Sequence, residues 1–89
     1  MTEPGDPIFD FPTFLSLKAI GMGTDDLPDI VAGIVRQHVP HLTDESVSQR
    51  LSSGGKYASI TISFMVESRA QLDSIYRDLN AHEQIIMVV

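Results

Sequence analysis

The feature that most constrains the fold is the stretch from residue 55 to residue 66, Gly-Lys-Tyr-Ala-Ser-Ile-Thr-Ile-Ser-Phe-Met-Val. From position 58 to position 66 every even-numbered residue is apolar, whereas the odd-numbered positions are mixed. A repeat of two that is rich in β-branched and aromatic residues is typical of a β-strand with one dry face. We therefore expect this strand at the centre of a sheet that is covered on one side only.

Length and composition predict a single small domain of 89 residues. Residues 1–10 carry three Pro or Gly residues and indicate a flexible N-terminal tail, so the domain spans residues 11–89. No apolar run approaches the roughly 18 residues that cross a membrane, and the first residues do not form a secretory signal. Cysteine is absent, which excludes disulfides and thiolate chemistry. We expect a cytoplasmic protein without membrane contact.

The first half of the chain predicts a strand followed by a helix. Residues 14–22 alternate, with the odd positions expected to face the core. After a Gly-rich loop, residues 27–39 predict a helix that ends before Pro40. Its expected apolar stripe consists of Leu27, Ile30, Val31, Ile34, Val35 and His38.

The second half predicts a hairpin, a helix and a last strand. Residues 46–53 read as a polar edge strand, joined to the central strand by a turn at residues 53–56. Ser68 and Gln71 have the spacing of a capping box, and Asn80 is the expected left-handed cap at the end of that helix. Residues 85–89 are almost wholly apolar, which fits either an inner strand or an edge that another chain covers.

The predicted order β-α-β-β-α-β is that of an α+β, ferredoxin-like fold (an alpha/beta plait) with two helices on one face of a four-stranded antiparallel sheet. Right-handed crossovers place the first and third strands side by side in the centre. The open face of the sheet then displays the even positions of the first strand beside the odd positions of the third.

Several short motifs, in this order and spacing, resemble the YbeD-like family of small bacterial proteins. They are Phe11-Pro12-Thr13, Lys18, Gly21, His38 with Pro40, the run Ser52 to Ser59, Ile75-Tyr76, and the terminal Met87-Val88-Val89. The resemblance spans residues 11–89, although Gln37 stands where the family pattern has a basic residue before His38. It implies a fold similar to the ACT regulatory domains, which bind small ligands such as amino acids, and a link to lipoate metabolism. It implies no catalytic residues and no cofactor.

The loop before the first helix is one candidate site. Gly21 and Gly23 precede a helix N-terminus, and in ACT domains a glycine of this loop lets a ligand approach the backbone. Three acidic residues crowd the same helix end and oppose an anionic ligand. The alternative is that the glycines only turn the chain. A small-molecule sensor and a loop without ligand are therefore both open.

The open sheet face is the candidate interface with a protein partner or a second copy of the chain. We expect the contact residues to be Phe14, Lys18, Ile20, Tyr57 and Met65. The segment around Tyr57 faintly resembles an RNA-binding strand, but the net charge of −6 opposes phosphate and makes nucleic-acid binding unlikely.

The sequence offers no enzymatic constellation. No phosphate-binding glycine motif, dinucleotide fingerprint or Ser-His-Asp context is present. His38 and His41, three positions apart, could share a metal, but Pro40 interrupts the helix between them. We interpret His38 as a packed or capping histidine and expect no metal and no cofactor. The sequence thus predicts a non-enzymatic regulatory or adaptor domain, dimeric, that acts through protein contacts.

Overall fold

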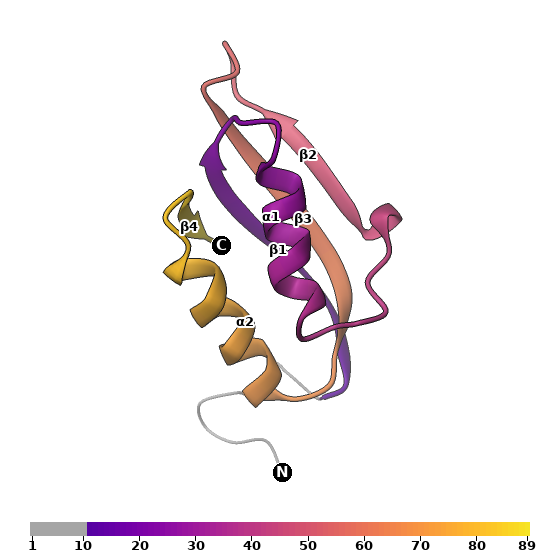
Figure 1. Cartoon of the computed structure of the whole chain (residues 1–89). Coiled ribbons are helices and arrows are strands. Elements are labelled where there is room, and N and C mark those ends of the chain that lie inside the picture. The colour runs from indigo at the N-terminus through magenta and orange to yellow at the C-terminus, as the bar shows by residue number, and fades with distance from the viewer. Residues whose placement is uncertain (1–10) are drawn as a thin grey trace.

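The computed structural model describes residues 11–89, and the tail expected over residues 1–10 lies outside the described residues. The described chain forms four strands and two helices in the predicted order (Figure 1). Their bounds are β1 Thr13–Met22, α1 Leu27–Arg36, β2 Val47–Leu51, β3 Tyr57–Val66, α2 Arg69–Ala81 and β4 Ile85–Val88. A short 3-10 turn, η1, covers Asp44–Ser46 and leads into β2.

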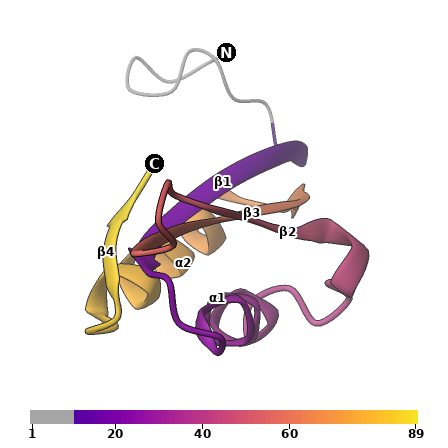
Figure 2. The ribbon, with the colours of Figure 1, turned by 90° about the horizontal axis from the view of Figure 1, so that it is seen from above.

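The four strands make one antiparallel sheet in the order β2-β3-β1-β4. The two central strands pair over their full length, from Thr13 opposite Val66 to Met22 opposite Tyr57. Figure 2 shows both helices on the same side of the sheet. The predicted ferredoxin-like arrangement is confirmed, with residues 57–66 at the centre of a sheet covered on one face.

The core lies between the sheet and the helices, where the odd positions of β1 and the even positions of β3 point. Ile60, Ile62 and Val66 of β3 are fully excluded from solvent. From α2, Leu72, Ile75 and Leu79 reach the same core. Full burial of one such side chain contributes roughly 1.5–3 kcal/mol to folding. The hydrophobic periodicity of the two central strands therefore supplies much of the stability of the domain.

Helix α1 differs from its prediction in length and in the face that it buries. It ends at Arg36, and residues 37–39 continue as a turn bonded to the carbonyl groups of residues 33–35. Ala32 is buried in it, whereas Ile30, Ile34 and His38 of the expected stripe are only half-buried. The helix packs through the row formed by Leu27, Val31 and Val35. A wide apolar stripe thus predicts the helix but not which residues at its margins are covered.

The start of α2 is capped almost as predicted. The Gln71 N–H donates to Ser68 Oγ over 3.2 Å. The Gln71 side chain does not return to Ser68, because its Oε1 accepts from the Glu67 N–H at 2.7 Å. Its Nε2 donates to the His38 carbonyl oxygen at 2.9 Å. Gln71 therefore joins the end of β3, the start of α2 and the end of α1.

Replacing Ser68 with alanine is expected to lower the free energy of unfolding by about 1 kcal/mol, because the Gln71 N–H loses its acceptor. Urea denaturation followed by circular dichroism measures the change. Ser53→Ala, at an exposed position in the hairpin, is the matched control, and its effect should stay within about 0.5 kcal/mol. Equal losses in the two variants would contradict the capping role.

The end of α2 contradicts the expected left-handed cap. Asn80 lies inside the helix, and no non-glycine residue of the described chain has a positive φ. The helix ends instead at His82, which is extended with φ −85° and ψ 131°. The His82 ring Nδ1 accepts from the Gln84 N–H at 3.1 Å and turns the chain into β4. The helix therefore ends with a hydrogen bond to the His82 side chain, and not with Asn80 in the left-handed conformation that was expected.

The β2–β3 hairpin and the edge strand β4 complete the sheet. Gly54 and Gly55 adopt positive φ values of 87° and 74°, as the tight-turn prediction requires. The open choice for residues 85–89 is resolved as an edge strand, since β4 pairs with β1 alone. Its register shifts between Ile20 and Gly21 of β1, which leaves Ile86 as the extra residue of a β-bulge.

Candidate functional site

The open face of the sheet carries all five residues predicted as an interface. The even positions of β1 lie opposite the odd positions of β3, and the cross-strand pairs are Phe14–Met65, Ser16–Ser63, Lys18–Thr61, Ile20–Ser59 and Met22–Tyr57. No helix covers these side chains, since both helices lie on the other face (Figure 2).

Exposed apolar side chains gather at the two ends of this face and leave a polar middle. At one end the Phe14 side chain is 63% exposed beside Met65. At the other end Met22 and Tyr57 pair, both also exposed. The middle contains the Ser16–Ser63 hydroxyl pair at 2.6 Å. The face thus offers two separate apolar contacts rather than one continuous patch.

The charged side chains that β1, β2 and β3 place on the open face are positive. Lys18 is central, Arg50 lies opposite Ser59 on β2, and the Lys56 Nζ lies 5.4 Å from the centre of the Tyr57 ring. No open-face position of β1, β2 or β3 carries a carboxylate, although the whole chain has a net charge of −6. The acidic residue Glu67 directly follows β3 and lines a depression with Phe14 and Met65, so the positive charge is concentrated around Lys18 and Arg50, where the face attracts negatively charged groups.

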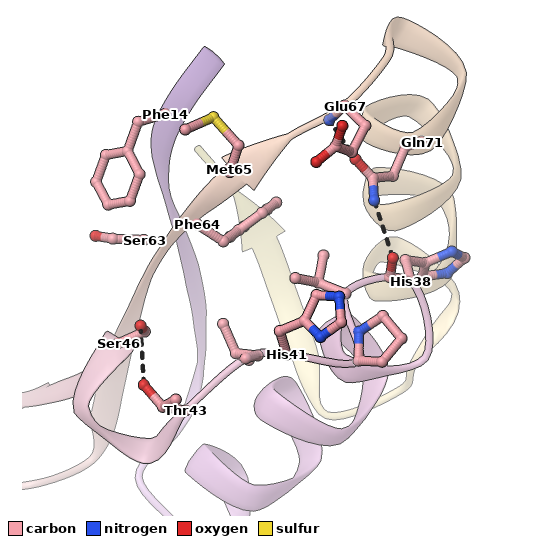
Figure 3. Close-up of a pocket in the computed structure, with 13 residues that line it drawn as sticks. Phe14, His38, His41, Thr43, Ser46, Ser63, Phe64, Met65, Glu67 and Gln71 are labelled. Carbon is pink, nitrogen blue, oxygen red and sulfur yellow. Dashed lines mark hydrogen bonds between the residues drawn. The ribbon is translucent and has the colours of Figure 1, made fainter. Parts of the chain in front are cut away.

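A hollow of about 520 Å³ adjoins the first apolar end of the face. One wall runs from Ser63 in β3 to Glu67 just after that strand, and the other is the α1–β2 connection (Figure 3). The bond from Gln71 to the His38 carbonyl closes one end. The remaining side chains of the lining are Phe14, Val39, Pro40, His41, Leu42, Thr43 and Ser46. We refer to this feature as the hollow.

A smaller depression of about 250 Å³ lies at the opposite end of the sheet. It is lined by Ile20, Arg50, Leu51, Ser52, Tyr57, Ala58 and Ser59. The open face is therefore flanked by one depression at each apolar end.

His38 and His41, the pair considered as metal ligands, have different environments. The His38 ring Nε2 lies 2.6 Å from Asp78 Oδ2, which joins the end of α1 to α2. His41 is exposed and lines the hollow. The described part of the chain holds no group of three or more His, Cys, Asp or Glu residues placed to share a metal ion. The contact with Asp78 places the His38 ring between the end of α1 and α2.

The two loop glycines are close to the chain's own backbone. A Cβ on Gly21 would overlap the Gln84 carbonyl oxygen, and one on Gly23 would overlap the Gly55 carbonyl oxygen. The Gly23 N–H also donates to the Lys56 carbonyl at 2.9 Å. Intrachain packing therefore gives both positions a reason to be glycine, without a ligand.

Sequence reasoning missed the hollow because its walls come from four separated segments. Val39 and Leu42 are buried in a connection that carries no periodic signal. In the structure β2 covers five residues and β3 ten, and the sequence pattern of residues 46–53 does not reveal this difference.

Nearly the whole chain matches a known protein family. Residues 6–89 match the family described as "Protein of unknown function (DUF493)". The chain belongs to this family. The UPF0250 protein of Chromobacterium violaceum is 35% identical over 89 residues, 100% of both chains. That of Shewanella woodyi is 38% identical over 84 residues, 94% of this chain and 93% of the relative. The YbeD-like resemblance is thereby confirmed.

Solved structures share the fold of this DUF493 chain. Protein HP0495 from H. pylori matches with a TM-score of 0.72 at 13% identity, over 98% of this chain and 91% of that chain. The ACT domain from the GTP pyrophosphokinase of Chlorobium tepidum matches with a TM-score of 0.59 at 10% identity, over 85% and 94%. At such identities the likeness establishes the fold alone, and it confirms the ACT-like, ferredoxin-like class. Neither α1 nor α2 of the described chain has the length and hydropathy of a membrane-spanning helix.

Proposed function

We propose that this DUF493 chain is a non-enzymatic regulatory or adaptor domain that binds a protein partner through its open sheet face. The observation that carries the proposal is the composition of that face. Exposed apolar side chains lie at both ends, and the charged side chains that the strands place between them, Lys18 and Arg50, are cations. A face of mixed apolar and charged residues that no helix covers is typical of a docking surface.

The charges define the chemistry of the partner. A surface with two apolar contacts separated by carboxylates complements Phe14, Lys18 and Tyr57. A second copy of the chain placed face to face would bring Lys18 and Arg50 against their own counterparts, which like-charge repulsion disfavours. The predicted homodimer would therefore use a different surface, such as side-chain contacts of the exposed Ile86, Met87 and Val89 rather than strand pairing along β4.

A single-stranded nucleic acid fits this face less well than a protein does. Phe14 and Met22, the partner of Tyr57, are eight residues apart on β1, which separates the two aromatic rings by about 26 Å. Bases that stack on aromatic side chains of a sheet need neighbouring platforms. The spacing of the aromatics supports a protein partner.

The remaining parts of the proposal rest on the sequence. We place the domain in the cytoplasm and assign it no reaction and no cofactor; a role close to lipoate metabolism rests on the YbeD-like resemblance alone. An ACT-like sensor with its ligand at Gly21 and Gly23 has less support, because the carbonyl oxygens of Gln84 and Gly55 already occupy the space beside them.

Photo-crosslinking from the open face tests the proposal. With p-benzoylphenylalanine in place of Tyr57, the chain is expected to crosslink to one protein in living bacterial cells. The double variant Lys18→Glu, Arg50→Glu should lower the yield about tenfold or more, because it reverses the two central charges. Arg77→Glu, at an exposed position on α2, should leave the yield unchanged.

Two crosslinking outcomes would overturn the proposal. One is a crosslink between two copies of this chain, which identifies the face as a homodimer contact. The other is a yield that is insensitive to the charge reversal. If the isolated domain instead gains thermal stability with an amino acid or another small metabolite and yields no crosslinked partner, the sensor is the better description.

A further inference from the structure

The end of β3 extends beyond its neighbour on one side. The last pair between β2 and β3 is Val47 opposite Ile62, and β3 continues to Val66. Along residues 63–66 the side of β3 that faces away from β1 is bordered by the hollow instead of a strand (Figure 3). This is a short open strand edge inside a lined depression.

The hydrogen-bond alternation tells which backbone groups point into the hollow. The Ser52 N–H donates to the Tyr57 carbonyl at 2.8 Å, so odd-numbered residues of β3 point towards β2. Independently, Lys18 and Val89 exchange two bonds of 3.1 and 2.7 Å, which turns the even positions of β1 towards β4 and its odd positions towards β3. By both arguments the N–H and C=O of Met65 point away from β1 and into the hollow.

The groups next to Met65 are already bonded. The Glu67 N–H, the next one in line, donates to Gln71 Oε1. The Ser46 N–H, which would continue the ladder from β2, donates to the Thr43 carbonyl instead at 3.0 Å. Within the described chain, Met65 is left as the strand residue whose backbone donor and acceptor face the hollow without a ladder partner.

The walls of the hollow specify side-chain chemistry as well. Val39, Leu42, Phe64 and Met65 make much of the lining apolar. Of the thirteen lining residues Glu67 alone carries a permanent charge, and the whole chain is acidic. The volume, about 520 Å³, lies within the roughly 300–1,000 Å³ of binding pockets.

We propose that an extended segment of a partner protein, with alternating apolar and basic residues, adds to this edge as a short strand. Its backbone pairs with the N–H and C=O of Met65, and one apolar side chain enters the hollow against Leu42 and Phe64. A neighbouring cationic side chain meets Glu67. Such strand addition derives affinity from main-chain hydrogen bonds and specificity from alternate side chains. The site shares Phe14 and Met65 with one end of the open face but includes neither Lys18 nor Arg50, so the charge-reversal variant and the peptide titration test the two proposals separately.

A peptide titration followed by nuclear magnetic resonance tests this site. The probe is the blocked pentapeptide Val-Lys-Val-Lys-Val, added to the ¹⁵N-labelled domain. The expected result is a saturable shift of the Met65 amide, with smaller shifts of the amides around Leu42 and Glu67. The same peptide methylated at its internal backbone nitrogens should bind about tenfold more weakly or worse, because it loses its donors. Val-Glu-Val-Glu-Val should also bind more weakly.

Substitutions of Met65 on the β3 edge provide a second test of peptide binding. Met65→Pro removes the N–H that faces the hollow but no bond of the β1–β3 ladder, and should weaken binding about tenfold. Met65→Thr keeps the N–H and should weaken it less than about threefold. If Met65→Pro fails to fold, the methylated peptide decides.

Equal binding of the methylated and unmethylated peptides would overturn the proposal, as would the absence of any saturable shift. Shifts confined to Lys18 and Thr61 would place the peptide on the open face and would likewise reject the edge site.

Discussion

Replacing Ile62 with aspartate is expected to unfold the domain. Ile62 is fully buried at the centre of the sheet, opposite Leu17 on β1 and Val47 on β2. A carboxylate placed there has no counter-ion and loses its hydration, which costs at least several kcal/mol. Because domains are stable by only about 5–15 kcal/mol, and those of this size tend to the low end, the loss consumes most or all of the stability.

The neighbouring substitution Thr61→Asp is the matched control. Thr61 is half-buried on the open face, opposite Lys18, so a carboxylate there stays hydrated and gains a favourable charge nearby. This variant should keep the native circular dichroism spectrum and a urea midpoint close to that of the parent chain. Similar spectra and midpoints for the two aspartate variants would show that the faces of β3 are wrongly assigned.

Replacing Gly21 with alanine should destabilise the domain by about 1–3 kcal/mol or more, because the added methyl group overlaps a backbone oxygen that cannot rotate away. The oxygen is that of Gln84, where the chain enters β4, and the Leu27 methyl groups lie only 3.2 Å from the new Cβ. Relief requires a shift of β4 or of α1. Urea denaturation measures the loss.

The substitution Gly33→Ala is expected to change the free energy of unfolding in the opposite direction, towards greater stability. Gly33 is exposed in the middle of α1, and nothing lies within 4 Å of an added Cβ. Alanine should therefore raise the free energy of unfolding by about 0.5–1 kcal/mol through helix propensity. If Gly21→Ala is instead tolerated as well as Gly33→Ala, packing is not what requires glycine at position 21, and a ligand at this loop becomes the better explanation.

The central strands could be predicted in detail because their information is local. Alternation in β1 and β3 assigns each side chain to a face, and this assignment alone is enough to place Lys18 and Tyr57 on the open surface. The same holds for the hairpin, where Gly54 and Gly55 supply the positive φ values that the turn demands. Periodicity and turn chemistry therefore determine this half of the fold.

Other features depend on contacts that are distant in sequence, and so they could not be predicted. The bond from Gln71 to the His38 carbonyl joins residues 33 positions apart. The hollow requires β2 to start late and the α1–β2 connection to fold back beside β3. The cap at His82 depends on a ring nitrogen that reaches Gln84 rather than on the backbone freedom of Asn80. Local sequence patterns carry no information about which of these groups come into contact.

The bulge at Ile86 has a consequence for how the domain behaves in a concentrated solution. A regular edge strand with exposed Ile86, Met87 and Val89 would be a template for the sheets of two molecules to pair edge to edge. The extra residue interrupts the even spacing of the free N–H and C=O groups along β4, so an incoming strand meets a row that it cannot match. The domain can thus keep an apolar margin without seeding aggregation.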